Sequence, residues 1–121
     1  MKYLLIIHNN PALFETLPAE ELDAMVGAHV PFQAALKETG ELVGFAALTD
    51  PSQARVVRTP VAAAPVVTDG PYLEAKEYLA GFYVVDAETP ERAAEIAAMM
   101  PEAAYGGVEV RAVMEDAGLE M

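Results

Sequence analysis

Several kinds of residue are scarce or absent in this chain of 121 residues, and each shortage narrows its chemistry. There is no cysteine, which excludes disulfides, thiolate nucleophiles and cysteine-ligated zinc or iron–sulfur sites. Basic residues are few, seven against nineteen acidic ones, so the formal net charge is −12. A surface of that sign repels phosphate backbones, and we expect no direct contact with nucleic acid.

Long apolar runs are also missing. No stretch approaches the roughly 20 apolar residues that a membrane-spanning helix needs. The first segment, MKYLLIIHNNP, has too short an apolar run and no small-residue cleavage site for a signal peptide. We therefore predict a cytoplasmic protein without membrane contact, and the length fits one domain, residues 1–121.

Four segments have the pattern of main strands: residues 2–7, 41–48, 78–85 and 108–114. Two shorter pieces, residues 54–58 and 66–67, read as a hairpin inserted between the second and third of them. With one helical region in each half, the order is β-α-β, hairpin, β-α-β. This order predicts an α+β fold, a ferredoxin-like split βαβ with an antiparallel sheet and an inserted hairpin.

The first helical region carries the main irregularity of the chain. Its apolar stripe, at spacings of three and four, is predicted to face the sheet; it consists of Leu22, Met25, Val26, His29, Phe32 or Gln33, and Leu36. Pro31 cannot donate to the carbonyl of Gly27, so we expect a kink or a restarted helix beside His29. The second region begins at Thr89-Pro90, a typical N-cap and first-turn pair.

The strands are apolar on both faces, and two helices cover only one face of a sheet. A second copy of the sheet is the economical cover for the other face. We therefore predict a homodimer through the sheet faces that closes toward a dimeric α/β barrel.

The segment DGPYLEAKEYLAGFY, residues 69–83, resembles the signature of the DGPF-motif branch of the YCII-related family. Tyr72 stands where that branch usually has phenylalanine, and the resemblance extends over most of the chain. It implies the same dimeric arrangement. Some YCII relatives resemble lyases that act in the breakdown of aromatic compounds, and related domains can occur attached to sigma-factor-like regulators.

His29 and Asp69 are the candidate catalytic residues. His29 lies in the helix stripe at a position where leucine or methionine is expected. It precedes the helix-ending Gly40 by eleven residues, a sequence spacing similar to that of the helix histidine in YCII-type sequences. It would act as base or acid; alternatively it is a histidine at the core rim, bonded to a backbone group such as the Gly27 carbonyl. Asp69 matches the motif and would orient His29, although turn chemistry alone favours a purely structural role before Gly70.

Lys76, Tyr72 and His8 are the candidate substrate-binding residues. Lys76 would hold an anionic substrate. The alternative, which we favour, is that it lies on an exposed helical turn and forms an ordinary surface ion pair. His8 lies at a strand end, where sites in sheet proteins are common. No ligand pair at helical spacing and no glycine-rich phosphate loop is present, so we predict neither a metal nor a cofactor.

These residues lead to two hypotheses about function. The first is an acid–base enzyme, lyase-like, that acts on a small aromatic or carbonyl compound through His29 and Asp69. The second is a non-catalytic module that binds a ligand or a protein partner, with a regulatory, transcription-associated role.

Overall fold

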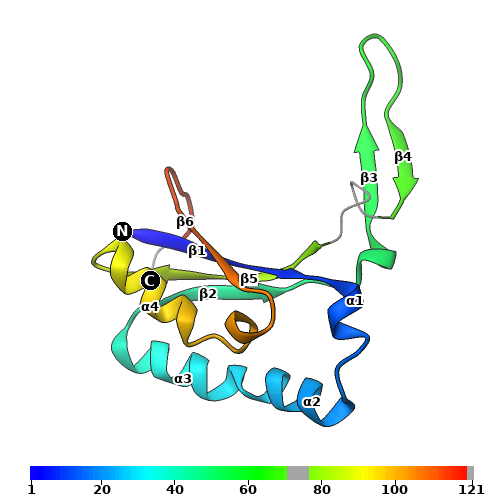
Figure 1. Cartoon of the computed structure of the whole chain (residues 1–121). Coiled ribbons are helices and arrows are strands. Elements are labelled where there is room, and N and C mark those ends of the chain that lie inside the picture. The colour runs from blue at the N-terminus through cyan, green and yellow to red at the C-terminus, as the bar shows by residue number, and fades with distance from the viewer. Residues whose placement is uncertain (71–76, 120–121) are drawn as a thin grey trace.

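The structure is a computed structural model and describes residues 1–70 and 77–119. Figure 1 shows the arrangement of its helices and strands. In chain order these are β1 (Lys2–Asn9), α1 (Pro11–Phe14), α2 (Ala19–Gly27), α3 (His29–Thr39), β2 (Leu42–Ala47), η1 (Pro51–Gln53), β3 (Arg55–Arg58), β4 (Val66–Asp69), β5 (Tyr78–Asp86), α4 (Pro90–Ala98), η2 (Pro101–Ala104) and β6 (Val108–Ala112).

The main sheet has the strand order β2-β5-β1-β6, and each neighbouring pair is antiparallel. The predicted split βαβ order is therefore confirmed, because the two central strands are the first and third of the four main strands. The strands β3 and β4 form a separate two-stranded sheet, which confirms the inserted hairpin. The fold is α+β and ferredoxin-like.

The core lies between the sheet and the helices, which gather on one side of it (Figure 1). Its most deeply buried members come from both layers: Leu5, Leu36, Val85, Ile96 and Met100. The helix α4 begins as the sequence predicts, with the Thr89 hydroxyl accepting a hydrogen bond of 3.1 Å from the Arg92 amide. Such a cap satisfies one of the free amides of the first helical turn.

The first helical region is divided where the sequence predicts. α2 ends at Gly27, Ala28 links the two helices, and α3 starts at His29. Pro31 lies in the first turn of α3, where its missing amide is least costly. The break places His29 at the start of a helix instead of in the middle of one.

The predicted stripe holds only in part. Met25, Phe32 and Leu36 are buried, with 8%, 6% and 1% of their surface exposed. Leu22 and Val26 are 36% and 62% exposed, so these two members of the stripe are not packed into the core. Both line a cavity beside the sheet instead.

The opposite face of the sheet is apolar along its two central strands. Leu4 and Ile6 of β1 pair with Val84 and Phe82 of β5, and they alternate with residues of the helix-side core. Side chains of successive strand residues point to opposite faces. These four residues, Leu4, Ile6, Phe82 and Val84, are called the open-face patch below; Leu4 and Phe82 are half-buried, whereas Ile6 and Val84 are buried within the chain itself, at 7% and 4% exposure.

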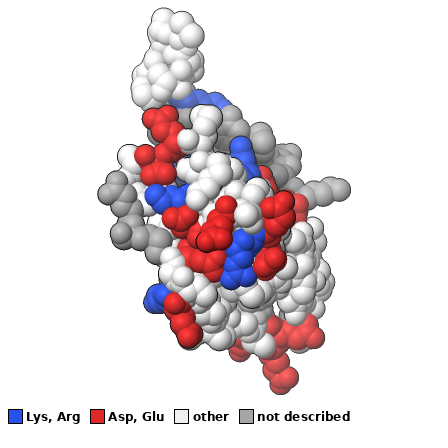
Figure 2. All heavy atoms as spheres, turned by 90° about the vertical axis from the view of Figure 1, so that its left-hand side faces the viewer, with Lys and Arg blue, Asp and Glu red and all other residues white. Residues whose placement is uncertain are grey.

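The β3–β4 hairpin extends away from the sheet on the side opposite the helices (Figure 1). In Figure 2 its tip rises as an uncharged projection above a body that carries most of the charged side chains in view. Its exposed apolar residues are Val57, Val61, Val66 and Val67. In the described residues, no helix has the length and apolar character required to cross a membrane.

Candidate functional site

A cavity of about 560 Å³ opens between the α2–α3 helices and the strands β2 and β5. Most of its wall is apolar and includes Phe14, Leu22, Met25, Val26 and Phe45. A few polar side chains face the same space; they are Asn9, His29, Gln33, Tyr78, Tyr83 and Glu102. An apolar cavity with a small convergent polar group is the usual form of a small-molecule site.

His29 is bonded through both of its ring nitrogens. Its Nδ1 lies 2.8 Å from the Tyr83 hydroxyl, and its Nε2 lies 2.6 Å from Glu102 Oε2. The side chain is 18% exposed, so the ring is partly accessible from the cavity. The alternative of a histidine bonded to the Gly27 carbonyl is not what the structure shows.

Tyr83 lies on β5 and is held by aromatic neighbours. Its ring stacks on those of His29 and Phe45, at centroid distances of 5.8 and 5.3 Å, and meets Phe32 edge-on at 5.1 Å. Its hydroxyl accepts a hydrogen bond of 2.9 Å from Gln33 Nε2. Burial raises the pKa of Tyr83 above its ordinary value of 10.0; the Gln33 bond opposes this rise, and the charge of Glu102 adds to it.

Glu102 is the residue that sequence reasoning missed. It lies in η2, the short helix after the end of α4, and η2 packs against α2. Only 7% of Glu102 is exposed. Its Oε1 atom is buried but has no hydrogen-bond partner among the described residues. One signal was present in the sequence, a carboxylate in the otherwise apolar segment MMPEAA directly after a helix stop.

The other predicted site residues lie elsewhere or outside the described residues. Asp69 ends β4 in the hairpin, is exposed, and pairs in register with Arg55; it is not among the residues that line the His29 cavity. His8 is on β1, where its Nε2 lies 2.8 Å from Glu109 Oε1, and it does not line the cavity either. Tyr72 and Lys76 fall in the segment 71–76 that the structure does not describe.

The three hydrogen bonds among Gln33, Tyr83, His29 and Glu102 form one directed chain when Glu102 is ionised. Glu102 then accepts a hydrogen bond from the protonated Nε2 of His29, and in this tautomer Nδ1 has a lone pair. The Tyr83 hydroxyl donates to that lone pair while it accepts from Gln33. This chain can take up one proton at Nδ1 and hold the resulting imidazolium against a carboxylate.

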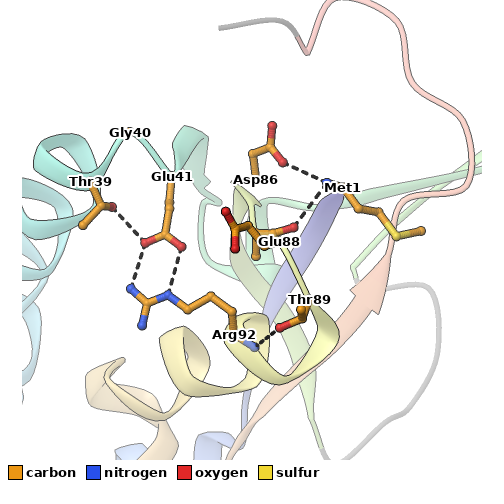
Figure 3. A pocket seen from close by; sticks show the side chains of 9 residues that line it. Met1, Thr39, Gly40, Glu41, Asp86, Glu88, Thr89 and Arg92 are labelled. Atoms are coloured by element: carbon orange, nitrogen blue, oxygen red, sulfur yellow. Dashed lines mark hydrogen bonds and ion pairs between the residues drawn. The ribbon is translucent and has the colours of Figure 1, made fainter.

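A second hollow, of about 510 Å³, lies at the start of α4 and is shown in Figure 3. There the Arg92 guanidinium forms a two-pronged pair with Glu41, at 2.9 and 2.8 Å, and Thr39 donates to the same carboxylate. The Arg92 hydrogen bond, assisted by Thr39, lowers the pKa of Glu41. Since Arg92 and Glu41 are already paired with each other, we assign this hollow a structural role.

Metal ligation is not indicated at either cavity. Across residues 1–70 and 77–119, no cluster of three or more His, Cys, Asp or Glu side chains has the geometry to hold a metal ion. His29 and Glu102 form a pair with each other instead.

Fold and site together define a class: a small ferredoxin-like α+β protein with a His–Tyr–Glu cluster in an apolar cavity. The chain belongs to the YCII-related family, since the model of the YCII-related domain matches residues 1–116. It is also similar to an uncharacterised protein of Rhizobium meliloti (strain 1021), with 29% identity over 113 residues that cover 92% of this chain and 90% of the relative.

Proposed function

We propose that this protein carries out acid–base chemistry on a small aromatic or carbonyl-containing molecule in the His29 cavity, with His29 as the base. The observation that carries the proposal is the hydrogen bonding of both His29 nitrogens, to Tyr83 and Glu102, on the wall of a largely apolar cavity. A carboxylate on one ring nitrogen fixes the tautomer and stabilises the imidazolium that forms when the other nitrogen takes a proton. In this proposal Glu102 takes the role for which the sequence suggested Asp69.

The proton path runs through the Tyr83 hydroxyl. A substrate proton moves to the Tyr83 oxygen while the phenolic proton moves to His29 Nδ1, and the electron pair of the broken bond stays on the substrate. A carbonyl group next to the reacting atom would accommodate that charge as an enolate. The raised pKa of Tyr83 supports a coupled transfer, because a free-standing tyrosinate is disfavoured in this cavity.

The test is proton exchange in heavy water. A panel of small aromatic ketones and aldehydes is incubated with the protein, and deuterium incorporation next to the carbonyl is followed by NMR. We expect exchange to be accelerated by the wild type and by His8→Gln, and lost by a factor on the order of 10² or more in His29→Gln and Glu102→Gln. Accelerated exchange that survives in His29→Gln would refute the assignment of the base.

We also propose that the protein is a homodimer that packs through the open-face patch and closes toward an α/β barrel. The support is the apolar character of this face between the two central strands, with the helices on the other side of the sheet. An apolar patch with a polar edge is typical of interaction surfaces. The polar edge here is formed by Glu109 and Arg111 of β6, whose Oε2 and Nε atoms are 3.7 Å apart.

The second candidate function is a non-catalytic module that binds a protein partner. The observation that favours it is the projecting hairpin, whose residues Val57, Val61, Val66 and Val67 are 49% to 99% exposed. In that case ligands would bind in the His29 cavity without proton exchange. The heavy-water experiment separates the two functions, since binding with no exchange in any member of the panel excludes the enzyme.

A further inference from the structure

Two residues that line the His29 cavity carry a buried side-chain oxygen atom that accepts no hydrogen bond from the described residues. One is Glu102 Oε1, on a side chain that is more than nine-tenths buried. The other is the amide oxygen Oδ1 of Asn9. Both residues line the same cavity. Both atoms are hydrogen-bond acceptors, so a ligand that supplies hydrogen-bond donors would satisfy them.

The charged residues of the cavity also favour a ligand that donates hydrogen bonds. No Lys or Arg is present among the cavity-lining residues that the structure describes, whereas Glu102 supplies a carboxylate. An anionic head group would meet no described Lys or Arg side chain and would face a carboxylate of its own sign, which is already paired with His29. A cationic donor would meet a charged acceptor in a setting of low polarity, where charge-assisted hydrogen bonds are strong.

The rest of the wall fits an apolar body. Phe14, Leu22, Met25, Val26 and Phe45 line the cavity, and Val26 and Phe45 are 62% and 50% exposed. These side chains lose contact with water when an aromatic or branched aliphatic group fills the cavity, and that burial contributes to affinity.

We propose that the ligand of this cavity is a small apolar amine whose protonated head donates hydrogen bonds to Glu102 Oε1 and Asn9 Oδ1. An ammonium group has three donors and no acceptor, which matches two unsatisfied acceptors. The Oε2 atom of Glu102 stays on His29. The inference rests on the proposed function in that it names the substrate class of the same cavity.

The experiment compares three probes that share one body and differ in the head group: 2-phenylethylamine, 2-phenylethanol and phenylacetate. Binding to the full-length chain at pH 7.5 is measured by NMR titration and calorimetry. We expect the amine to bind at least ~10-fold more tightly than the alcohol, and phenylacetate to bind more weakly than both. Amide shifts are expected at Val30, Ala46 and Gly81, which border the cavity.

Variants assign the preference to its atoms. Glu102→Gln is expected to abolish the preference for the amine over the alcohol, and Asn9→Ala to reduce amine affinity. His8→Gln, at a histidine–glutamate pair outside the cavity, is the matched control and should leave all three affinities unchanged. The three-probe comparison on the wild type needs no variant, so it stands if Glu102→Gln fails to fold.

The outcomes are separable from those of the proposed function. Phenylacetate binding as tightly as the amine, equal affinity for all three probes, no binding of any probe, or an amine preference that survives in Glu102→Gln would each overturn the amine assignment. Proton exchange without an amine preference refutes this inference alone. An amine preference without exchange in any carbonyl or amine compound refutes the acid–base function alone.

Discussion

At the scale of single residues, Tyr83 is where the polar and aromatic contacts of the cavity meet. Its hydroxyl joins Gln33 to His29, and its ring packs on Phe32 and Phe45. A ring held on several sides has a fixed direction for its hydroxyl group, which is what a proton bridge requires. Only 3% of the residue is exposed, so its ionisation is tied to the stability of the fold.

Tyr83→Phe is expected to change the dependence of stability on pH. At pH 8 the variant should be less stable by on the order of 1 kcal/mol, because two hydrogen bonds are lost. The pKa of Tyr83 is raised above 10.0 in the folded protein, so above pH 10 the unfolded wild type loses its phenolic proton before the folded one does. The wild type should therefore lose stability faster than the variant as the pH rises above 10, and the gap should narrow.

Urea unfolding of both proteins between pH 8 and 11 measures this gap. Tyr105→Phe is the control, since Tyr105 lies after η2 and outside the cavity. It leaves the hydrogen bonds of Tyr83 in place, so the loss of stability expected for Tyr83→Phe at pH 8 should not occur in it. A gap between the wild type and Tyr83→Phe that stays constant over the whole range contradicts the raised pKa.

The candidate site could be predicted from the sequence only in part. His29 was recognisable because a titratable residue interrupts an apolar stripe. Glu102 was not recognisable, because its contact with His29 joins residues 73 positions apart in the sequence. The contact also depends on η2, a short helix that no hydrophobic periodicity predicts. Tyr83 was assigned to a strand, but alternation alone does not tell which face of a sheet lies under the helices.

At the scale of elements, two glycines illustrate opposite demands of the fold. Gly27 ends α2, and a methyl group added there would meet nothing within 4 Å. Gly81 lies in β5 opposite Ala47 of β2, and a methyl group there would lie 2.6 Å from the Ala46 carbonyl oxygen. The first glycine is replaceable, and the second permits close approach of two strands.

Substitution by alanine is therefore expected to have opposite effects at these two positions. Gly27→Ala should stabilise the protein by about 0.5 to 1 kcal/mol, because it reduces the freedom of the unfolded chain. Gly81→Ala should destabilise it by about 1 to 3 kcal/mol, because backbone must move to relieve the overlap. Urea unfolding at neutral pH measures both, and equal effects of the same sign would contradict this account.

The order of the elements was more predictable than their orientation. Every main strand and the N-cap at Thr89 follow from local pattern and turn chemistry. The exposure of Leu22 and Val26 did not follow, because helical spacing identifies an apolar face but not whether that face meets a sheet or a cavity. The break at Gly27 and Pro31 was visible in the sequence, and its effect on the cavity was visible only in three dimensions.

At the scale of the whole molecule, the proposed dimer gives the third prediction. Light scattering at micromolar concentration should give a mass of about twice the 12.9 kDa of the chain. Phe82→Glu places a charge in the centre of the open-face patch and should yield monomers, because burying an unpaired charge is costly. Val61→Glu, at a residue that is 99% exposed in the hairpin, is the control and should remain dimeric.

The result that would contradict this packing is a stable monomer of the wild type. A dimer that persists in Phe82→Glu and dissociates in Val61→Glu would instead assign the contact to the hairpin. Both variants alter side chains outside the His29 cavity, so the affinity for a cavity ligand is an independent measure of correct folding.

The way the hairpin joins the sheet has a consequence for how such a chain can diverge. The Gly70 amide donates to the Ala54 carbonyl at 2.8 Å, so the hairpin is closed at its base. Lengthening a loop that is already closed costs little, about 0.6 kcal/mol for each doubling of its length. Insertions and deletions within residues 55–69 would thus leave the four-stranded sheet undisturbed, and this arm is where we expect natural length variation to collect and where a foreign peptide can be grafted.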